Sequence, residues 1–323
     1  MKNIWALAVA FAASVAATAA ITTALAQPAP GAQLNLIVGF AAGGSADSIA
    51  RVVGNRLGEK HNRKIVVENR PGAGANIATR AVIGATPDGS TLLVSTAALA
   101  INETLYRNKG FSVDALRTIA VVATTPEVFA VNPANPGQTL ADFVQQNRGK
   151  EITFATAGIG TSSHIAAEYF FSQLVKTEAR HVPFRGGPDA TNAVLGGHVP
   201  MVVSSLSGFA SQVAGGQLTG LAVAADQRVA VIGKVPTFTE AGYPGFKAMS
   251  WVGFFAPSAT PSAELVRLNK EIDDIVREPA IRERLIAIGF DPMNATQPEA
   301  ETYFRREVEQ WRKMVQTLGL SVE

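Results

Sequence analysis

The sequence predicts an α/β fold made of two similar units, each a parallel β-sheet with helices on both faces. Short apolar runs alternate with segments whose apolar residues recur at helical spacing. This alternation begins again after the segment NPANPGQT at 132–139, which has the composition of a linker. With 47% hydrophobic and 17% charged residues in 323, the chain can bury the cores that two such units need.

In the first unit, the apolar run LNLIV at 34–38 is predicted to be a buried strand. An amphipathic helix follows it, with Ile49 and Leu57 on its apolar face. The run KIVVEN at 64–69 predicts the next strand, before a loop and a short helix. After the turn sequence PDGS, a third strand is expected at 91–96.

The second unit repeats this order. Helices are expected at 164–175 and within 185–197, and strands at 151–157, 180–184, 199–205 and 218–224. From Pro261 onward the chain is predicted to be helical. Two apolar stripes in this part indicate core-facing helix surfaces. They consist of Leu265, Leu268, Ile272, Ile275 and Val276, and of Phe304, Val308, Trp311, Val315 and Leu318.

Residues 1–26 have the pattern of a secretory signal peptide. Lys2 precedes an Ala-rich apolar stretch, and Ala24-Leu25-Ala26 supplies a small-x-small cleavage site. An uncleaved membrane anchor is the alternative, because the apolar stretch is long enough to span a bilayer. The Pro-rich sequence after Ala26 favours cleavage. Since the chain has no cysteine, a lipid-modified cysteine is excluded, and we expect a mature protein free in the periplasm of a Gram-negative cell.

The loop that joins the first strand to its helix has the features of an anion site. Gly43 and Gly44 lack a Cβ, so a ligand can approach the main chain closely. The helix then starts near Ser45 or Ala46, where unpaired N–H groups and the helix dipole favour a small anion. The alternative is structural, with Ser45 or Asp47 capping the helix.

The second unit repeats this arrangement, which favours a binding site over a simple cap. Gly158 and Gly160 follow a strand, and Thr161, Ser162 and Ser163 lead into a helix. Two such loops can face one another across a cleft at the carboxyl ends of the strands. Their hydroxyl groups suit direct or water-bridged bonds to a carboxylate. The polar loops 95–103 and 204–208 can add to the walls of the cleft.

Other functional classes find less support. The glycine patterns at 72–77 and 158–163 lack the third glycine of GxGxxG, and GxxxxGK[ST] is absent, which argues against nucleotide cofactors. A net charge of +2 without basic runs argues against nucleic acid. No two of the four His have metal-ligand spacing, and GxSxG and HExxH are absent. A hydrolase using Ser162 with His164 as general base remains an alternative, although a capping His is favoured.

Blocks along most of the chain resemble the substrate-binding proteins of tripartite tricarboxylate transporters, the TctC-like Bug receptors. The blocks are LIVGFAAGGSADSIAR, VVENRPGAGANIATRAV, PDGSTLLVST, INETLY, GIGTSSHIAAEYF, HVPFRGGPDATNAVLGGHV, VPTFTEAGYPGF and WVGFFAPSATP, in family order. The resemblance implies a type II periplasmic-binding-protein fold, in which two α/β domains close on a ligand between them. It places domain 1 at 32–128 and 252–323 and domain 2 at 129–251, with crossings near 126–131 and 250–256.

The resemblance also implies a function without catalysis: a receptor, expected to be a monomer without cofactor or metal, that delivers a small carboxylate to the large and small subunits of a membrane permease. Family members hold the carboxylate through backbone amides and ordered waters. A ligand-sensing role beside a sensor kinase is the alternative. The predicted ligand-binding residues are Phe40, Gly43, Gly44, Ser45, Ala46, Asp47, Thr96, Ala97, Gly160, Thr161, Ser162, His164, Ser204 and Ser205.

Two departures from the family pattern bear on the ligand. The family commonly has PFPPGG where this chain has GFAAGG, so the first loop is less constrained here. It commonly has HVPYKGG where this chain has HVPFRGG, so Phe184 removes a hydroxyl and Arg185 adds a group able to bind a second carboxylate. Whether Arg185 and Asp47 contact the ligand is left open by the sequence.

Overall fold

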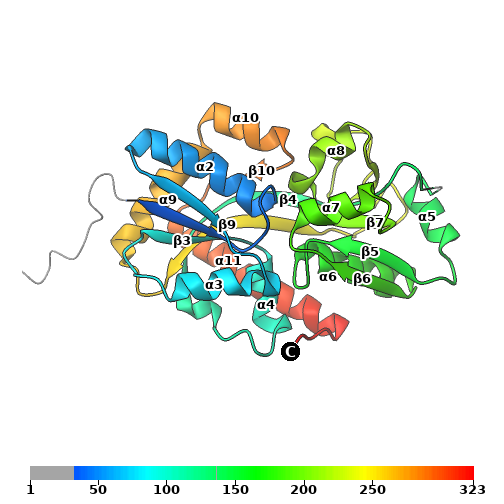
Figure 1. The fold of residues 1–323 in the computed structure, drawn as a ribbon, viewed down its shortest axis with the longest axis horizontal. Helices are drawn as coiled ribbons and strands as arrows, with labels where there is room; N and C mark the ends of the chain where they lie inside the picture. Colours follow the sequence, from blue (N-terminus) through cyan, green and yellow to red (C-terminus); the bar gives the residue numbers. More distant parts are fainter. Residues whose placement is uncertain (1–32, 136) are drawn as a thin grey trace, which may run out of the picture.

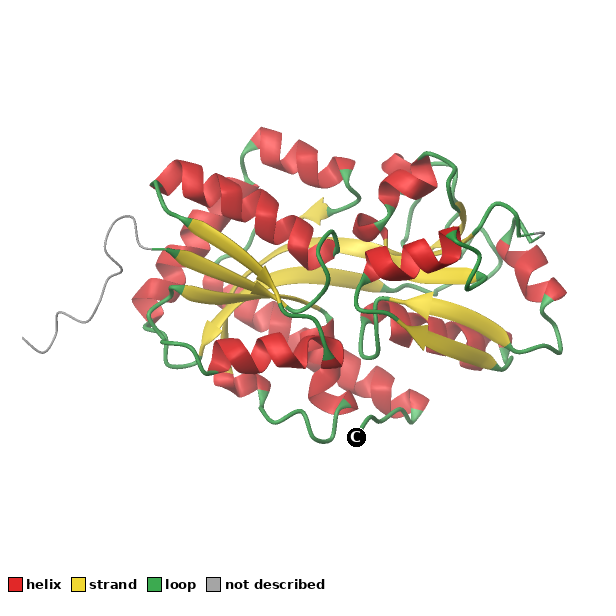
Figure 2. Cartoon of the chain, in the orientation of Figure 1, coloured by secondary structure: helices red, strands yellow, loops and turns green. Residues whose placement is uncertain are grey.

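A computed structural model describes residues 33–135 and 137–323, so the predicted signal peptide lies outside the described residues. The described chain forms two sheets covered by helices (Figure 1; Figure 2). In the first sheet, the parallel strands β2 (Ile65–Asn69), β1 (Leu34–Val38) and β3 (Thr91–Thr96) lie in that order. β9 (Met249–Pro257) runs antiparallel beside β3.

The second sheet has the same parallel core. β7 (Met201–Ser205), β5 (Ile152–Thr156) and β6 (Ala179–Pro183) lie side by side and parallel. β8 (Thr219–Val223) pairs antiparallel with the long strand β4 (Leu116–Val131). All seven strands that the residue pattern predicts are therefore present, and their ends differ from the predicted ends by at most about two residues.

One long strand, β4 (Leu116–Val131), takes part in both sheets. Up to Pro126 it pairs with β9, and from Glu127 onward it pairs with β7 and β8. The short strand β10 (Asp291–Pro292) pairs with the part of β4 that lies in the first sheet. β4 and β9 run through the centre of the molecule from one sheet toward the other (Figure 2).

Helices cover both faces of the first sheet because its strands are apolar on both sides. Leu36 and Val38 pack against the helices on one face, whereas Ile37 packs toward the opposite face, as the alternation of side chains along a strand requires. These helices are α2 (Ser45–His61), α9 (Ser262–Val276) and α10 (Pro279–Ala287) on one face, and α3 (Asn76–Ile83), α4 (Ala98–Leu105) and α11 (Gln297–Leu318) on the other.

The second sheet is covered in the same way. Phe129 and Val131 of β4 face α5 (Leu140–Gln146), α6 (Ser162–Tyr169) and the π-helical turns Phe170–Val175. Val128 and Ala130 face α7 (Gly187–Leu195) and α8 (Ala210–Ala214). Four short 3₁₀ turns complete the described part of the chain, at Ala73–Ala75, Val113–Ala115, Leu206–Gly208 and Ala230–Ile232.

The C-terminal part confirms the prediction of core-facing stripes. The α9 stripe is fully buried, and Phe304, Val308 and Val315 of α11 are buried as well, while Trp311 and Leu318 pack against the same core. Across residues 33–135 and 137–323, no helix combines the length and the apolar character that a membrane span requires.

Candidate ligand-binding site

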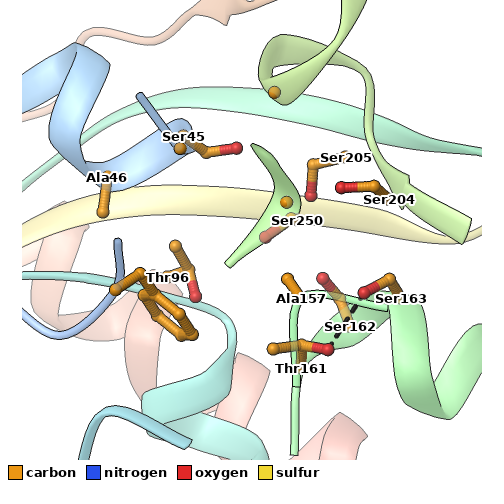
Figure 3. A pocket seen from close by; sticks show the side chains of 14 residues that line it. Ser45, Ala46, Thr96, Ala157, Thr161, Ser162, Ser163, Ser204, Ser205 and Ser250 are labelled. Atoms are coloured by element: carbon orange, nitrogen blue, oxygen red, sulfur yellow. Dashed lines mark hydrogen bonds between the residues drawn. The ribbon is translucent and has the colours of Figure 1, made fainter. Parts of the chain in front are cut away.

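A small cavity lies between the two sheets. Eight of its 14 lining residues carry hydroxyl groups, and none of these described residues carries a charge. Ser45 and Thr96 lie on one side of the space, and Ser162, Ser204 and Ser205 on the other (Figure 3). The lining consists of Phe40, Gly44, Ser45, Ala46, Thr96, Ala157, Thr161, Ser162, Ser163, Gly187, Ser204, Ser205, Gly208 and Ser250.

The start of α2 contributes main-chain donors to this cavity. Gly43 has φ +81°, a left-handed conformation that favours glycine and lets the chain turn tightly into the helix. Gly44 is the N-cap and offers no side chain to cap the first turn. The N–H groups of Ser45 and Ala46, which have no partner within a helix, therefore keep their hydrogen-bonding capacity at the positive end of the helix dipole.

Asp47 does not line the cavity but stabilises the loop before α2. Its carboxylate accepts hydrogen bonds from Gly43 N, from Nε and Nη2 of Arg51, and from Nδ2 of Asn69, all at 2.9 Å. Burial raises the pKa of Asp47, but these hydrogen bonds and the Arg51 charge outweigh burial and hold the pKa below its ordinary value. The carboxylate is thus saturated with donors from the first half of the molecule.

The start of α6 is capped by its own hydroxyl groups. Thr161 is the N-cap, and its Oγ1 accepts a hydrogen bond from His164 N at 3.3 Å. Thr161 Oγ1 in turn donates to Gly158 O at 2.7 Å. Because one first-turn N–H group is already used by the cap, α6 offers fewer free main-chain donors than α2.

A third helix begins at the same cavity. Gly187, the first residue of α7, lines it, and the N-cap Gly186 makes no side-chain hydrogen bond. Thr96 lies at the carboxyl end of β3, and Ser204 and Ser205 end β7. The lining therefore comes largely from strand ends and helix starts, where ligands of open α/β sheets bind.

The two halves touch at the rim of the cavity. Ser45 Oγ lies 2.6 Å from Ser207 Oγ, and Ala41 N donates to Arg185 O at 3.1 Å. The side chain of Arg185 is exposed and lines a neighbouring groove with Phe40 and Ala157, outside the 14-residue lining. The loop before α2 and the loop before α7 thus meet in this structure.

Nine of the predicted ligand-binding residues line the cavity: Phe40, Gly44, Ser45, Ala46, Thr96, Thr161, Ser162, Ser204 and Ser205. The other five predicted residues lie outside the lining: Gly43, Asp47, Ala97, Gly160 and His164.

Packing explains where these five lie. Gly43 faces Pro188 at the rim, and Gly160 packs against Asn102 of α4. Ala97 is fully buried at the start of α4. The four donors described above direct the Asp47 carboxylate toward its own loop.

His164 is directed into the second half of the molecule. Its ring stacks on that of His181, with 4.2 Å between centroids, and its Nδ1 accepts a hydrogen bond from Gly160 N at 3.4 Å. Burial lowers the pKa of His164 to about 4. The hydroxyl of Ser162 donates to Glu127 Oε1 at 2.6 Å, which does not match the Ser–His pair of a hydrolase.

Five lining residues are not among the 14 predicted ligand-binding residues: Ala157, Ser163, Gly187, Gly208 and Ser250. Of these, Ser163 and Gly208 lie in loops that the sequence predicts at the cleft. The sequence GGP at the start of α7 repeats the glycine-then-helix pattern and could have indicated Gly187. Ser250 carries no local signal, because it reaches the cavity only through the return of β9.

Among residues 33–135 and 137–323, no group of three or more His, Asp or Glu could hold a metal ion.

Comparisons with known proteins agree with this architecture. A family model described as tripartite tricarboxylate transporter family receptor matches residues 49–320. The protein BugT of Bordetella pertussis is 30% identical over 300 residues, which cover 91% of this chain and 91% of BugT.

Two solved structures are similar along nearly the whole chain. The periplasmic binding protein BugD superposes with a TM-score of 0.86 at 26% identity, over 92% of this chain and 100% of that chain. The Rhodopseudomonas palustris protein Rpa4515, solved with adipate, gives a TM-score of 0.87 at 26% identity, over 91% of this chain and 99% of that chain. The predicted periplasmic-binding-protein fold is thereby confirmed. The chain belongs to the tripartite tricarboxylate transporter family of receptors, as its sequence motifs predict.

Proposed function

We propose that this protein is a periplasmic receptor that binds a small carboxylate in the cavity between its two halves and delivers it to a tripartite permease. The observation that carries the proposal is an uncharged, hydroxyl-rich cavity at the starts of three helices. Such a site can bind an anion through main-chain N–H groups without a cationic side chain.

The carboxylate is expected at the start of α2. There the N–H groups of Ser45 and Ala46 border the cavity, and no side chain caps the helix. A carboxylate has two acceptor oxygens, which match two adjacent N–H donors. Ser45 Oγ can add a third hydrogen bond. Adipate in the similar structure of Rpa4515 supports a carboxylate as the ligand class.

Ligand binding is expected to stabilise a closed arrangement of two domains. The proposed division into 32–128 with 252–323 and 129–251 is supported by β4, which changes its pairing partners between Pro126 and Glu127. A ligand that contacts Ser45 on one side and Ser204 on the other gains both sets of contacts only when the domains are close. Its differential affinity then shifts the population toward the closed state.

The family and the signal-peptide pattern at residues 1–26 support delivery to a permease and a location in the periplasm.

The ligand can be identified by native mass spectrometry of freshly purified protein, because a receptor of this kind can retain its ligand. Isothermal titration with mono-, di- and tricarboxylates then measures the affinities. We expect at least one carboxylate with a Kd of about 10 µM or below. Binding of neutral or cationic solutes with no carboxylate binding would overturn the proposal.

A further inference from the structure

Glu127 is an acidic residue inside an otherwise apolar part of β4. It precedes Val128 and Phe129, and its side chain is fully buried. Alternation along the strand places it on the same face as Phe129, toward α6. Glu127 is not part of the cavity lining, so it can act on a ligand only through residues that are.

Two lining residues donate their hydroxyl hydrogens to Glu127. Ser162 Oγ donates to Oε1 at 2.6 Å, and Ser205 Oγ donates to the same oxygen at 2.9 Å. A serine hydroxyl has one hydrogen and two lone pairs. Toward the cavity, the hydroxyl groups of Ser162 and Ser205 are therefore left with lone pairs only, and they can accept a hydrogen bond but not donate one.

A third hydroxyl has the same polarity. Thr161 Oγ1 gives its hydrogen to Gly158 O, so in the 2.9 Å contact between Thr161 Oγ1 and Ser163 Oγ the donor is Ser163. The hydroxyl of Ser163, which also lines the cavity, then accepts rather than donates toward a ligand.

The cavity thus has two chemically different ends. The start of α2 offers N–H donors to an anion, whereas the wall around Ser162 and Ser205 offers acceptors backed by a buried carboxyl. We propose that Glu127 makes this wall selective for a hydrogen-bond donor, so that the ligand is a carboxylate that also carries an ammonium or hydroxyl group. This inference rests on the proposed function, because it takes the carboxylate end as given.

The environment of Glu127 favours an ammonium group over a hydroxyl. Its Oε2 accepts no hydrogen bond from the described residues, and no Lys, Arg or His in that part of the chain forms an ion pair with it. Burial raises the pKa of Glu127 to about 7, against the opposing effect of the two serine hydrogen bonds. A cationic group on the ligand that donates hydrogen bonds to Ser162 and Ser205 would supply the positive charge that the Glu127 carboxylate lacks.

The test uses matched ligand series that differ in one substituent: propionate, lactate and alanine; succinate, malate and aspartate; adipate, 2-hydroxyadipate and 2-aminoadipate. Isothermal titration of the wild type is expected to show at least about tenfold tighter binding of the ammonium-bearing member than of the unsubstituted one in the series that fits. The hydroxyl-bearing member should lie between them.

Two variants separate charge from hydrogen bonding. Glu127→Gln removes the charge but keeps an acceptor for the serines, so the ammonium preference should fall about tenfold while the hydroxyl preference remains. Glu127→Met removes the acceptor and fits an apolar strand. It frees the serine hydroxyls to donate and should abolish both preferences. Ser162→Ala and Ser205→Ala should each reduce the preference without altering Glu127, which covers the case in which Glu127→Met does not fold.

Glu307→Gln is the matched control, because Glu307 Oε2 also accepts two side-chain hydrogen bonds, from Trp251 and Trp311, away from the cavity lining. This variant should keep the wild-type ratio. Unchanged ratios in Glu127→Met or in the serine variants, with carboxylate binding intact, would overturn the role of Glu127 and leave the proposed function standing. A wild type that binds no carboxylate, either in these series or in the wider panel of mono-, di- and tricarboxylates, would overturn both.

Discussion

The hydroxyl oxygens of Ser45 and Ser207 lie 2.6 Å apart and join the first turn of α2 to the 3₁₀ turn after β7. The backbone N–H of Ser207 also donates a hydrogen bond to Oγ1 of Thr125, on the central strand β4, at 3.2 Å. The contact therefore connects the two sides of the cavity next to the strand that both sheets share. It is a direct hydrogen bond that exists only while the two sides are close.

Removing this contact should weaken ligand binding with little effect on folding. Ser45→Ala and Ser207→Ala are each expected to lower the affinity for the identified ligand. A double-mutant cycle on the Kd should give a coupling of about 0.5–1.5 kcal/mol, the range of a net hydrogen bond. Ser211→Ala is the control, because Ser211 Oγ donates to Gln212 within the same half. Strict additivity of the two changes would contradict the role of the contact in closure.

Gly160→Ala should separate the two halves at the edge of the cavity. Gly160 has φ +79°, and a Cβ there would collide with Oδ1 of the buried Asn102 in α4. Gly216 has φ +74° and open space around its Cβ position, so Gly216→Ala carries the backbone strain alone. Both variants should lose about 1–2 kcal/mol of unfolding free energy.

Only Gly160→Ala should also bind the ligand at least about tenfold more weakly, because the added methyl group holds the 158–163 loop away from α4. Calorimetry and chemical denaturation of the two variants measure both effects. Equal affinities of Gly160→Ala and Gly216→Ala would show that the Gly160–Asn102 contact has no part in closure.

Asp47→Asn should destabilise the protein by about 1–3 kcal/mol. A simple helix cap would tolerate asparagine, but here four donors surround the carboxylate, and the asparagine NH₂ group would face at least one of them. The midpoint of urea unfolding measures the loss. Asp114→Asn, at an exposed ion pair with Arg305, is the control and should cost less than about 1 kcal/mol. Equal losses would contradict the stabilising role of Asp47.

Glu127 and the His164–His181 pair should give opposite pH dependences of stability. The folded pKa of Glu127, about 7, is above its unfolded value near 4.5, so its contribution is present below pH 4.5 and is lost as the pH rises through 7. Burial lowers the pKa of His164 to about 4, and burial together with His164 lowers that of His181 to about 3. Their contribution is present above pH 6.5 and is lost as the pH falls toward 3–4.

Glu127→Gln separates the two effects. Relative to the wild type, its unfolding free energy should increase by about 2–3 kcal/mol between pH 5 and pH 8. In this range only the wild type releases a proton from residue 127 when it unfolds, so only the wild type becomes less stable for this reason as the pH rises. Urea titrations at a series of pH values measure this difference. A difference that is independent of pH would mean that Glu127 titrates at its ordinary pKa.

The local elements could be predicted because each depends on neighbouring residues. The run LNLIV specifies β1, and the glycines before Ser45 and Ser162 mark both helix starts. Of the nine predicted residues that line the cavity, Gly44, Ser45, Ala46, Thr161 and Ser162 lie in these two loops. Thr96, Ser204 and Ser205 come from the polar loops at 95–103 and 204–208, and Phe40 comes from the family resemblance.

Contacts between distant segments could not be predicted from the same patterns. The carboxylate of Asp47 is held partly by Asn69 at the end of β2, and His164 is turned inward by stacking on His181 of β6. Ser250 joins the cavity because β9 returns beside β4. Glu127 did carry a signal, since a lone acid in an apolar strand is rarely without a partner. Its partners, Ser162 and Ser205, come from two other elements and are known only from the fold.

The most direct test of the central claim is an NMR titration that follows the backbone amide resonances of Ser45 and Ala46. The titrant is the carboxylate from the calorimetric panel that binds most tightly, with its primary amide as the comparison. We predict that the amide protons of both residues shift downfield and saturate with the calorimetric Kd, whereas the primary amide produces neither shift at the same concentration. Saturated carboxylate binding that leaves both resonances unmoved would contradict a site built on the first turn of α2.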